Sequence, residues 1–284
     1  MTACTPVPAP QTHAADLFLE VDDTRLRFRD EGNGPAVLLV HGWTLDLQMW
    51  DPQVTALRDA FRLIRLDRRG HGLSTGIPAQ ERDSGDLAAL CAHLRLARVA
   101  LLGMSQGARA VLDFASSARV PVDAVILDGP PSLDGKSDPD LPLDRYATLV
   151  RTRGIEAFRF EWARDPLMQL RTHDAEAHAL LAAMITRYPG NDLKYSAPRA
   201  ERDAGSSLES VAAPTLVLSG AHDLASRRRA ARQLAVRLRD AELTVIPAAG
   251  HLPNLDRPDV YSELCRQFLT RHCARESSCA RATS

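Results

Sequence analysis

The feature that most constrains this 284-residue chain is a regular alternation of short apolar runs with helical patterns. Apolar, β-branched runs of strand length occur at residues 16–21, 25–29, 36–40, 61–66, 99–102, 124–127, 215–218 and 243–246. Helical patterns follow most of the later runs, at residues 52–59, 86–96, 106–117, 226–238 and 258–271. A strand followed by a helix is typical of a mostly parallel sheet that helices cover on both faces. The sequence therefore predicts the α/β class, with an eight-stranded sheet whose first two strands form a hairpin at Asp22 and Asp23.

One long interval breaks this alternation. Between residues 131 and 207 no run reads convincingly as a strand, but apolar residues recur with helical spacing, best at Ala177, Leu180, Leu181, Met184 and Ile185. An interval of that length between two strands is too long for an ordinary loop. We therefore expect a helical cap (lid) at residues 131–207, inserted into an α/β core formed by residues 1–130 and 208–284.

Composition excludes several classes of function. The chain carries 35 basic and 36 acidic residues, so no net field attracts it to nucleic acid or to an anionic membrane. No segment approaches the ~20 apolar residues of a membrane span, and residues 1–16 lack the apolar core of a secretory signal. The five cysteines show no C-x-x-C spacing, and the histidines form no metal motif. We expect a cytoplasmic protein without a metal, a cofactor, a nucleic-acid partner or a membrane partner; the oligomeric state stays open.

The strongest local motif is Gly103-Met104-Ser105-Gln106-Gly107, which lies between a predicted buried strand and a predicted helix. A serine on such a tight turn adopts a strained conformation with its hydroxyl projecting, and the flanking glycines relieve crowding. The N-terminus of the following helix favours negative charge that develops near the serine. The pattern alone is a weak match, but in this position it indicates that Ser105 is a nucleophile.

Three motifs together resemble the α/β-hydrolase superfamily. They are the serine turn, the segment His41-Gly42-Trp43 after an earlier strand, and residues 67–74, Asp-Arg-Arg-Gly-His-Gly-Leu-Ser. The chain is similar to the capped branch that contains small esterases, enol-lactonases and perhydrolases, and that also includes serine-dependent macrolide esterases. This resemblance covers the core on both sides of the cap. It implies a carboxylic ester hydrolase, a serine esterase or lactonase that forms an acyl-enzyme on a small-molecule substrate, and it extends to bulky lactones such as macrolides.

The same resemblance leaves other chemistries open. Perhydrolysis, hydrolysis of a C–C bond and elimination all occur with this fold, and a slowly reacting ligand receptor is a further alternative. Related dehalogenases and epoxide hydrolases carry aspartate at the position of Ser105, which argues against those two reactions.

A serine at neutral pH needs a base, and the base needs an acid that orients it. By the resemblance, His251 in the Gly250-His251 loop is the base, while His41 and His71 are expected to stabilise loops. Two aspartates at strand ends, Asp223 and Asp128, compete as the acid. The segment at residues 220–223, which ends at Asp223, resembles the family's acid loop. It also gives the order Ser, Asp, His along the chain, so we expect Asp223 in this role.

The resemblance also implies the oxyanion donors and part of the substrate site. The two donors are the backbone N–H groups of Gln106, directly after the serine, and Trp43, directly after His-Gly. We expect Trp43, Met104, Trp162 and Met184 to contact the substrate. Apolar residues at such spacing can equally pack a small helical core, and an apolar lid is compatible with both interpretations.

Overall fold

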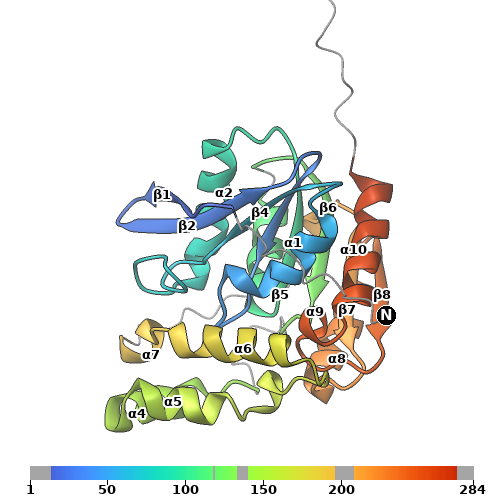
Figure 1. Ribbon diagram of the computed structural model, residues 1–284. Helices are drawn as coiled ribbons and strands as arrows, with labels where there is room; N and C mark the ends of the chain where they lie inside the picture. Colours follow the sequence, from blue (N-terminus) through green and yellow to red (C-terminus); the bar gives the residue numbers. More distant parts are fainter. Residues whose placement is uncertain (1–13, 118, 133–139, 196–207, 274–284) are drawn as a thin grey trace, which may run out of the picture.

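A computed structural model describes residues 14–117, 119–132, 140–195 and 208–273 (Figure 1). Its centre is one eight-stranded sheet in the order β1-β2-β4-β3-β5-β6-β7-β8. β1 pairs antiparallel with β2 and β2 with β4, while all the other neighbours are parallel. The strands are β1 (Leu17–Val21), β2 (Thr24–Glu31), β3 (Ala36–Val40), β4 (Arg62–Leu66), β5 (Val99–Met104), β6 (Val122–Asp128), β7 (Thr215–Gly220) and β8 (Ala241–Ile246).

The predicted α/β class and the eight-stranded, mostly parallel sheet are confirmed. The hairpin between β1 and β2 turns at Asp22, whose φ of 52° is in the left-handed region that such tight turns use. The helix predicted at residues 86–96 is displaced, because α2 runs over Gln80–His93. Its first turn is polar, with Glu81 and Asp83, and therefore gave no apolar periodicity before residue 86.

Helices cover both faces of the sheet because successive strand residues point to opposite sides. Leu39 and Leu63 belong to the apolar cluster that contains the helices at residues 51–57 and 258–272, whereas Leu38 and Ile64 belong to the cluster that contains α2 and the helices at residues 106–116 and 225–237. The remaining core helices are η1 (Leu47–Trp50), α1 (Asp51–Leu57), α3 (Gln106–Ser116), α8 (Ala225–Arg237), α9 (Pro253–Asp256) and α10 (Pro258–His272).

The long interval between β6 and β7 is helical in its described part. Figure 1 shows these helices stacked against one end of the core, and we call them the inserted helices. α6 coincides with the strongest periodicity in the sequence, and the predicted C-terminal limit of the cap at residue 207 lies outside the described residues. The inserted helices are α4 (Leu143–Arg153), α5 (Ile155–Trp162), η2 (Pro166–Met168), α6 (Ala175–Arg187) and α7 (Asn191–Lys194).

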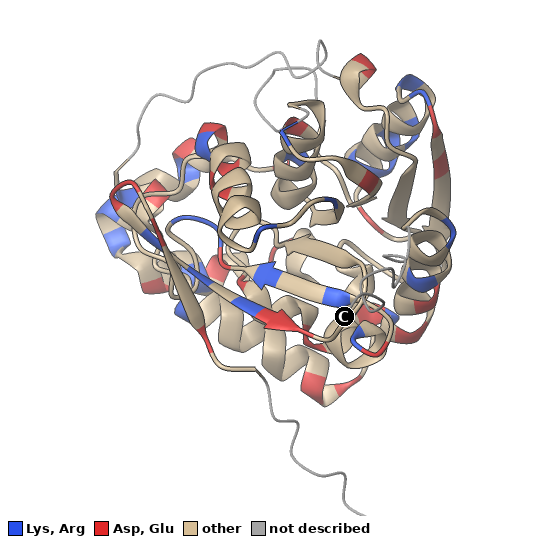
Figure 2. Ribbon diagram, turned by 90° about the horizontal axis from the view of Figure 1, so that it is seen from above, with Lys and Arg blue, Asp and Glu red and all other residues tan. Residues whose placement is uncertain are grey.

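The charged residues alternate in sign around the molecule. Figure 2 shows Lys and Arg interspersed with Asp and Glu along the outer elements, as expected from a formal net charge of -1. In the part of the chain that the structure describes, none of the helices has the length and apolar character needed to cross a membrane.

Candidate active site

Ser105 lies on a sharp turn between β5 and α3. Its φ of 53° and ψ of −117° place a non-glycine residue in a strained backbone conformation. A Cβ at Gly103 would lie 2.3 Å from the Gly107 carbonyl oxygen, and a Cβ at Gly107 would lie 2.2 Å from the Val40 carbonyl oxygen. The Ser105 N–H donates to the Asp128 carbonyl oxygen at 2.8 Å, which ties the turn to β6. Both flanking glycines are therefore required by close backbone contacts.

His251 and Asp223 form a buried pair beside this turn. His251 Nδ1 and Asp223 Oδ2 are 2.9 Å apart, and both side chains are almost inaccessible to solvent. Because a carboxylate only accepts, Nδ1 carries the proton and the lone pair stays on Nε2, where a base needs it. The two loops pack backbone against backbone, since a Cβ at Gly220 would lie 2.0 Å from the Gly250 carbonyl oxygen.

Asp128, the alternative acid, makes no hydrogen bond with His251 in the described structure. Its carboxylate oxygens are buried, and burial together with the negative charge of Asp223 raises the pKa of Asp128 well above its usual value. Gly129, with φ of 51°, leaves space for the pair, because a Cβ there would lie 3.0 Å from His251 Cε1. The geometry thus joins His251 to Asp223 and leaves Asp128 as a buried neighbour of the pair.

Of the two predicted oxyanion donors, Gln106 directly follows Ser105 and Trp43 lies on a neighbouring loop. A Cβ at Gly42 would lie 3.3 Å from Ser105 Cβ, so the loop that carries Trp43 touches the serine turn. Within the described residues, neither the Trp43 nor the Gln106 backbone N–H donates to a protein acceptor. Gln106 opens α3, where the first N–H groups of a helix have no partner inside the helix. Both N–H groups are thus available to a bound oxygen atom.

His41 and His71 brace the loops around these donors. His41 Nδ1 donates to the Gly42 carbonyl oxygen at 2.7 Å, and His41 Nε2 accepts from the Arg68 N–H at 2.8 Å. Burial lowers the pKa of His41 well below its usual value, and burial with the nearby Arg68 charge lowers the pKa of His71 to about 4. Both rings are therefore neutral, which agrees with a structural role and not with that of a base.

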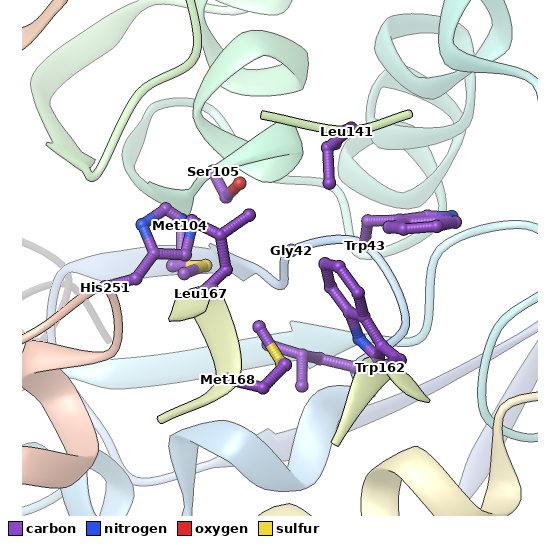
Figure 3. A pocket seen from close by; sticks show the side chains of 10 residues that line it. Gly42, Trp43, Met104, Ser105, Leu141, Trp162, Leu167, Met168 and His251 are labelled. Atoms are coloured by element: carbon purple, nitrogen blue, oxygen red, sulfur yellow. The ribbon is translucent and has the colours of Figure 1, made fainter. Parts of the chain in front are cut away.

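A small apolar pocket lies over Ser105 and encloses about 240 Å³, including its open mouth. Figure 3 shows Ser105 and His251 at one end of it and the rings of Trp43 and Trp162 at the other. Of the expected substrate contacts, Trp43, Met104 and Trp162 line this pocket, while Met184 is not among the lining residues and is buried in the apolar cluster. The lining residues are Gly42, Trp43, Leu45, Met104, Ser105, Leu141, Trp162, Leu167, Met168 and His251.

Sequence reasoning missed several residues that hold the site together. Asp256 accepts from the Gly250 N–H at 2.7 Å and from the backbone N–H groups of Arg171 and Thr172, so it joins the His251 loop to the insertion. Arg68 donates to Gln106 Oε1 at 3.4 Å and pairs with Asp83. No local pattern indicates these contacts, because all of them except the one to Gly250 join residues at least 15 positions apart. Among the described residues, His, Cys, Asp and Glu form no group of three that suits a metal ion.

Known proteins resemble this chain in sequence and in fold. A thermophilic esterase from Thermogutta terrifontis superposes with a TM-score of 0.79 at 30% identity, covering 91% of this chain and 99% of the esterase. An enol-lactonase from Burkholderia xenovorans gives a TM-score of 0.76 at 27% identity, covering 89% of this chain and 100% of the lactonase. A putative 2-succinyl-6-hydroxy-2,4-cyclohexadiene-1-carboxylate synthase from Bacillus subtilis is 26% identical over 269 residues, which are 88% of this chain and 96% of the relative. The model of the alpha/beta hydrolase family matches residues 37–264, and the chain belongs to this family.

Proposed function

We propose that the protein hydrolyses a carboxylic ester or lactone through an acyl-enzyme on Ser105. His251 Nε2 takes the Ser105 proton as Oγ attacks the carbonyl carbon, and Asp223 holds His251 in the required tautomer. The backbone N–H groups of Trp43 and Gln106 stabilise the oxyanion. His251 then passes the proton to the leaving alcohol, and water attacks the acyl-serine by the same route. We also propose that the insertion at residues 131–207 acts as the cap over this site.

The observation that carries this proposal is the strained Ser105 in the same pocket as the buried His251–Asp223 pair. In the described residues no hydrogen bond joins Ser105 Oγ to His251. Such contacts are often long without a substrate and tighten in the complex. A strained serine, an imidazole bonded to a carboxylate and two backbone N–H groups without a protein acceptor are the parts that acyl transfer requires.

The pocket supports a small, uncharged substrate group. Apart from Ser105 and His251, all of its lining residues are apolar or glycine, so no fixed charge would bind a carboxylate. The hollow contains about 240 Å³ of space with its open mouth included, so the enclosed part beside Ser105 is smaller than that. We therefore propose a short acyl group as the part that binds beside Ser105. This volume does not favour the macrolide expectation, which remains one arm of the test below.

Labelling with a fluorophosphonate tests the nucleophile. The wild-type protein should be phosphonylated on Ser105, and Ser105→Ala should not be labelled. Ser262→Ala, which removes another buried serine, is the matched control and should label like the wild type. Equal labelling of Ser105→Ala and wild type would sink the assignment.

A substrate panel then tests the reaction and the size of the substrate. p-Nitrophenyl acetate and butyrate should react faster than the dodecanoate ester, and a macrolide should be the poorest substrate. Faster turnover of the macrolide than of the short esters would reverse the size argument.

We propose a second candidate reaction, elimination or C–C bond cleavage, because one relative is named a putative synthase. An enzyme that uses the same residues for elimination or C–C bond cleavage need not form an acyl-serine when it is given a simple ester. Mass spectrometry after rapid quenching should find an acyl group on Ser105. If p-nitrophenol is released without that adduct, the acyl-enzyme mechanism is wrong.

A further inference from the structure

Trp43 is bound through its side chain by an inserted helix. The indole Nε1–H of Trp43 donates to Asp192 Oδ2 at 2.7 Å, across 149 residues of sequence. Asp192 belongs to α7, and its other oxygen accepts from the Tyr188 hydroxyl. Trp43 is only 4% exposed, so its N–H needs a protein acceptor. A hydrogen bond to a carboxylate is about twice as strong as one between neutral groups.

Two neighbouring contacts tie the same loop to the insertion. Trp162 Nε1 on α5 donates to Thr44 Oγ1 at 2.7 Å. Arg187 on α6 pairs with Asp46 at 2.7 Å. Residues 43–46 thus receive one polar contact from each of three inserted helices. We call this segment the oxyanion loop, since the proposed mechanism assigns the Trp43 backbone N–H to the oxyanion.

Trp43 links these contacts to the proposed reaction, because its backbone N–H is one of the two proposed oxyanion donors. Its ring also packs against Trp162 and Tyr188, with centroid distances of 5.0 and 5.9 Å. The side chain is therefore held by the Asp192 carboxylate at its N–H and by T-shaped contacts with two rings. Because side chain and backbone share one Cα, fixing the indole limits rotation of the Trp43 peptide N–H.

We propose that Asp192 is a positioning residue, which holds the Trp43 backbone N–H at the oxyanion through the indole. This inference rests on the proposed function. It means that the inserted helices form part of the oxyanion machinery in addition to covering the pocket. Loss of the hydrogen bond between the Trp43 indole and Asp192 should lower kcat more than it raises KM, because the oxyanion develops only after the substrate has bound.

Steady-state kinetics on p-nitrophenyl acetate test this. Removal of a whole oxyanion donor costs about 100- to 1,000-fold in kcat, so Asp192→Ala, which only loosens one, should lose roughly 10- to 100-fold. KM should stay within about two-fold. Asp192→Asn keeps an oxygen that accepts from the indole and should retain at least about a third of wild-type kcat.

A pair of tyrosines gives a matched control. Tyr188 and Tyr146 are both buried in the insertion, and both hydroxyls donate to a carboxylate, Asp192 and Asp165 respectively. Only Asp192 also binds Trp43. Tyr188→Phe should lower kcat several-fold, while Tyr146→Phe should stay within about two-fold. This comparison stands even where Asp192→Ala does not fold.

Amide hydrogen exchange of residues 42–47 provides a readout that is independent of activity. Exchange there should accelerate in Asp192→Ala and Tyr188→Phe, but not in Asp192→Asn or Tyr146→Phe. Equal kcat and equal exchange in Tyr188→Phe and Tyr146→Phe would overturn the proposal. So would an Asp192→Asn variant as impaired as Asp192→Ala. Failure of the proposed function appears separately, as absence of Ser105 labelling in the wild type.

Discussion

The two halves of the proposed catalytic site, an acid–base half and an oxyanion half, are built differently. In the acid–base half, Asp223 and His251 lie on neighbouring loops after β7 and β8, and these loops touch through backbone at Gly220 and Gly250. In the oxyanion half, the loop at residues 43–46 is held by side chains of inserted helices more than a hundred residues away. The first half is a product of sheet topology, whereas the second depends on how the insertion packs.

The two halves should therefore differ in how far they depend on the inserted helices. Neighbouring parallel strands bring the Asp223 and His251 loops together in any chain that forms this sheet. The oxyanion loop keeps its contacts only while α5, α6 and α7 are in place. Changes to the Asp223–His251 pair should therefore abolish proton transfer. Changes to the contacts of the oxyanion loop should each weaken oxyanion stabilisation only in part.

The largest effect is expected at the acid. Asp223→Asn should lower kcat by about 10⁴-fold, because the amide stabilises the wrong tautomer of His251. Asp128→Asn should change kcat by less than about ten-fold, since Asp128 makes no hydrogen bond with His251 among the described residues, and burial beside Asp223 raises its pKa. Kinetics on p-nitrophenyl acetate measure both. A larger loss in the Asp128 variant would exchange the two roles.

Asp256 offers a test of stability in the acid–base half. Asp256→Ala removes the acceptor of three backbone N–H groups at a buried site, so the free energy of unfolding should fall by about 3 kcal/mol. Asp259→Ala, at an exposed carboxylate nearby, should change it by less than about 0.5 kcal/mol. Urea unfolding measures both, and similar values for the two variants would show that Asp256 does not brace the loop.

The pH dependence of stability should report on His71 beneath the oxyanion loop. Burial lowers its pKa from 6.5 to about 4, so between these values the unfolded chain binds a proton that the folded chain does not. Stability from this group is full above pH 6.5 and falls as the pH drops, by about 1 kcal/mol between pH 6 and pH 5. His71→Asn keeps a donor for the Arg69 carbonyl oxygen but does not titrate. The difference in unfolding free energy between wild type and variant should shrink by that amount over this range, and a constant difference would contradict the neutral ring.

An effect of similar size is expected at Thr44. Thr44→Val leaves the buried Trp162 indole N–H without its acceptor and should cost about 1–2 kcal/mol of stability. Thr186→Val, which removes a hydroxyl on the exposed side of α6, should cost less than about 0.5 kcal/mol. Thermal unfolding compares the two, and equal melting temperatures would show that the α5 contact contributes little to the oxyanion loop.

Much of the fold was predictable because its signals are local. Strands produce short runs rich in apolar and β-branched residues, so all eight strands were located from the sequence. Helices α4, α5 and α7 were not located individually: α5 and α7 have only eight and four residues, and α4 carries four charged residues among its eleven. Met184 illustrates the limit at the site: its helical spacing indicated a buried face but not whether that face meets the pocket or the apolar cluster.

The sequence by itself determined the serine turn, because the glycines at 103 and 107 and the strand before them are neighbours in the chain. It also placed an aspartate and a histidine after the last two strands, where a parallel sheet brings their loops together. Only the tertiary structure decided that Asp223 and not Asp128 contacts His251, that the pocket is small, and that Asp192 binds Trp43. The physical reason is distance along the chain: motifs encode contacts between near neighbours, whereas the contacts of the insertion depend on how complete helices pack against the core.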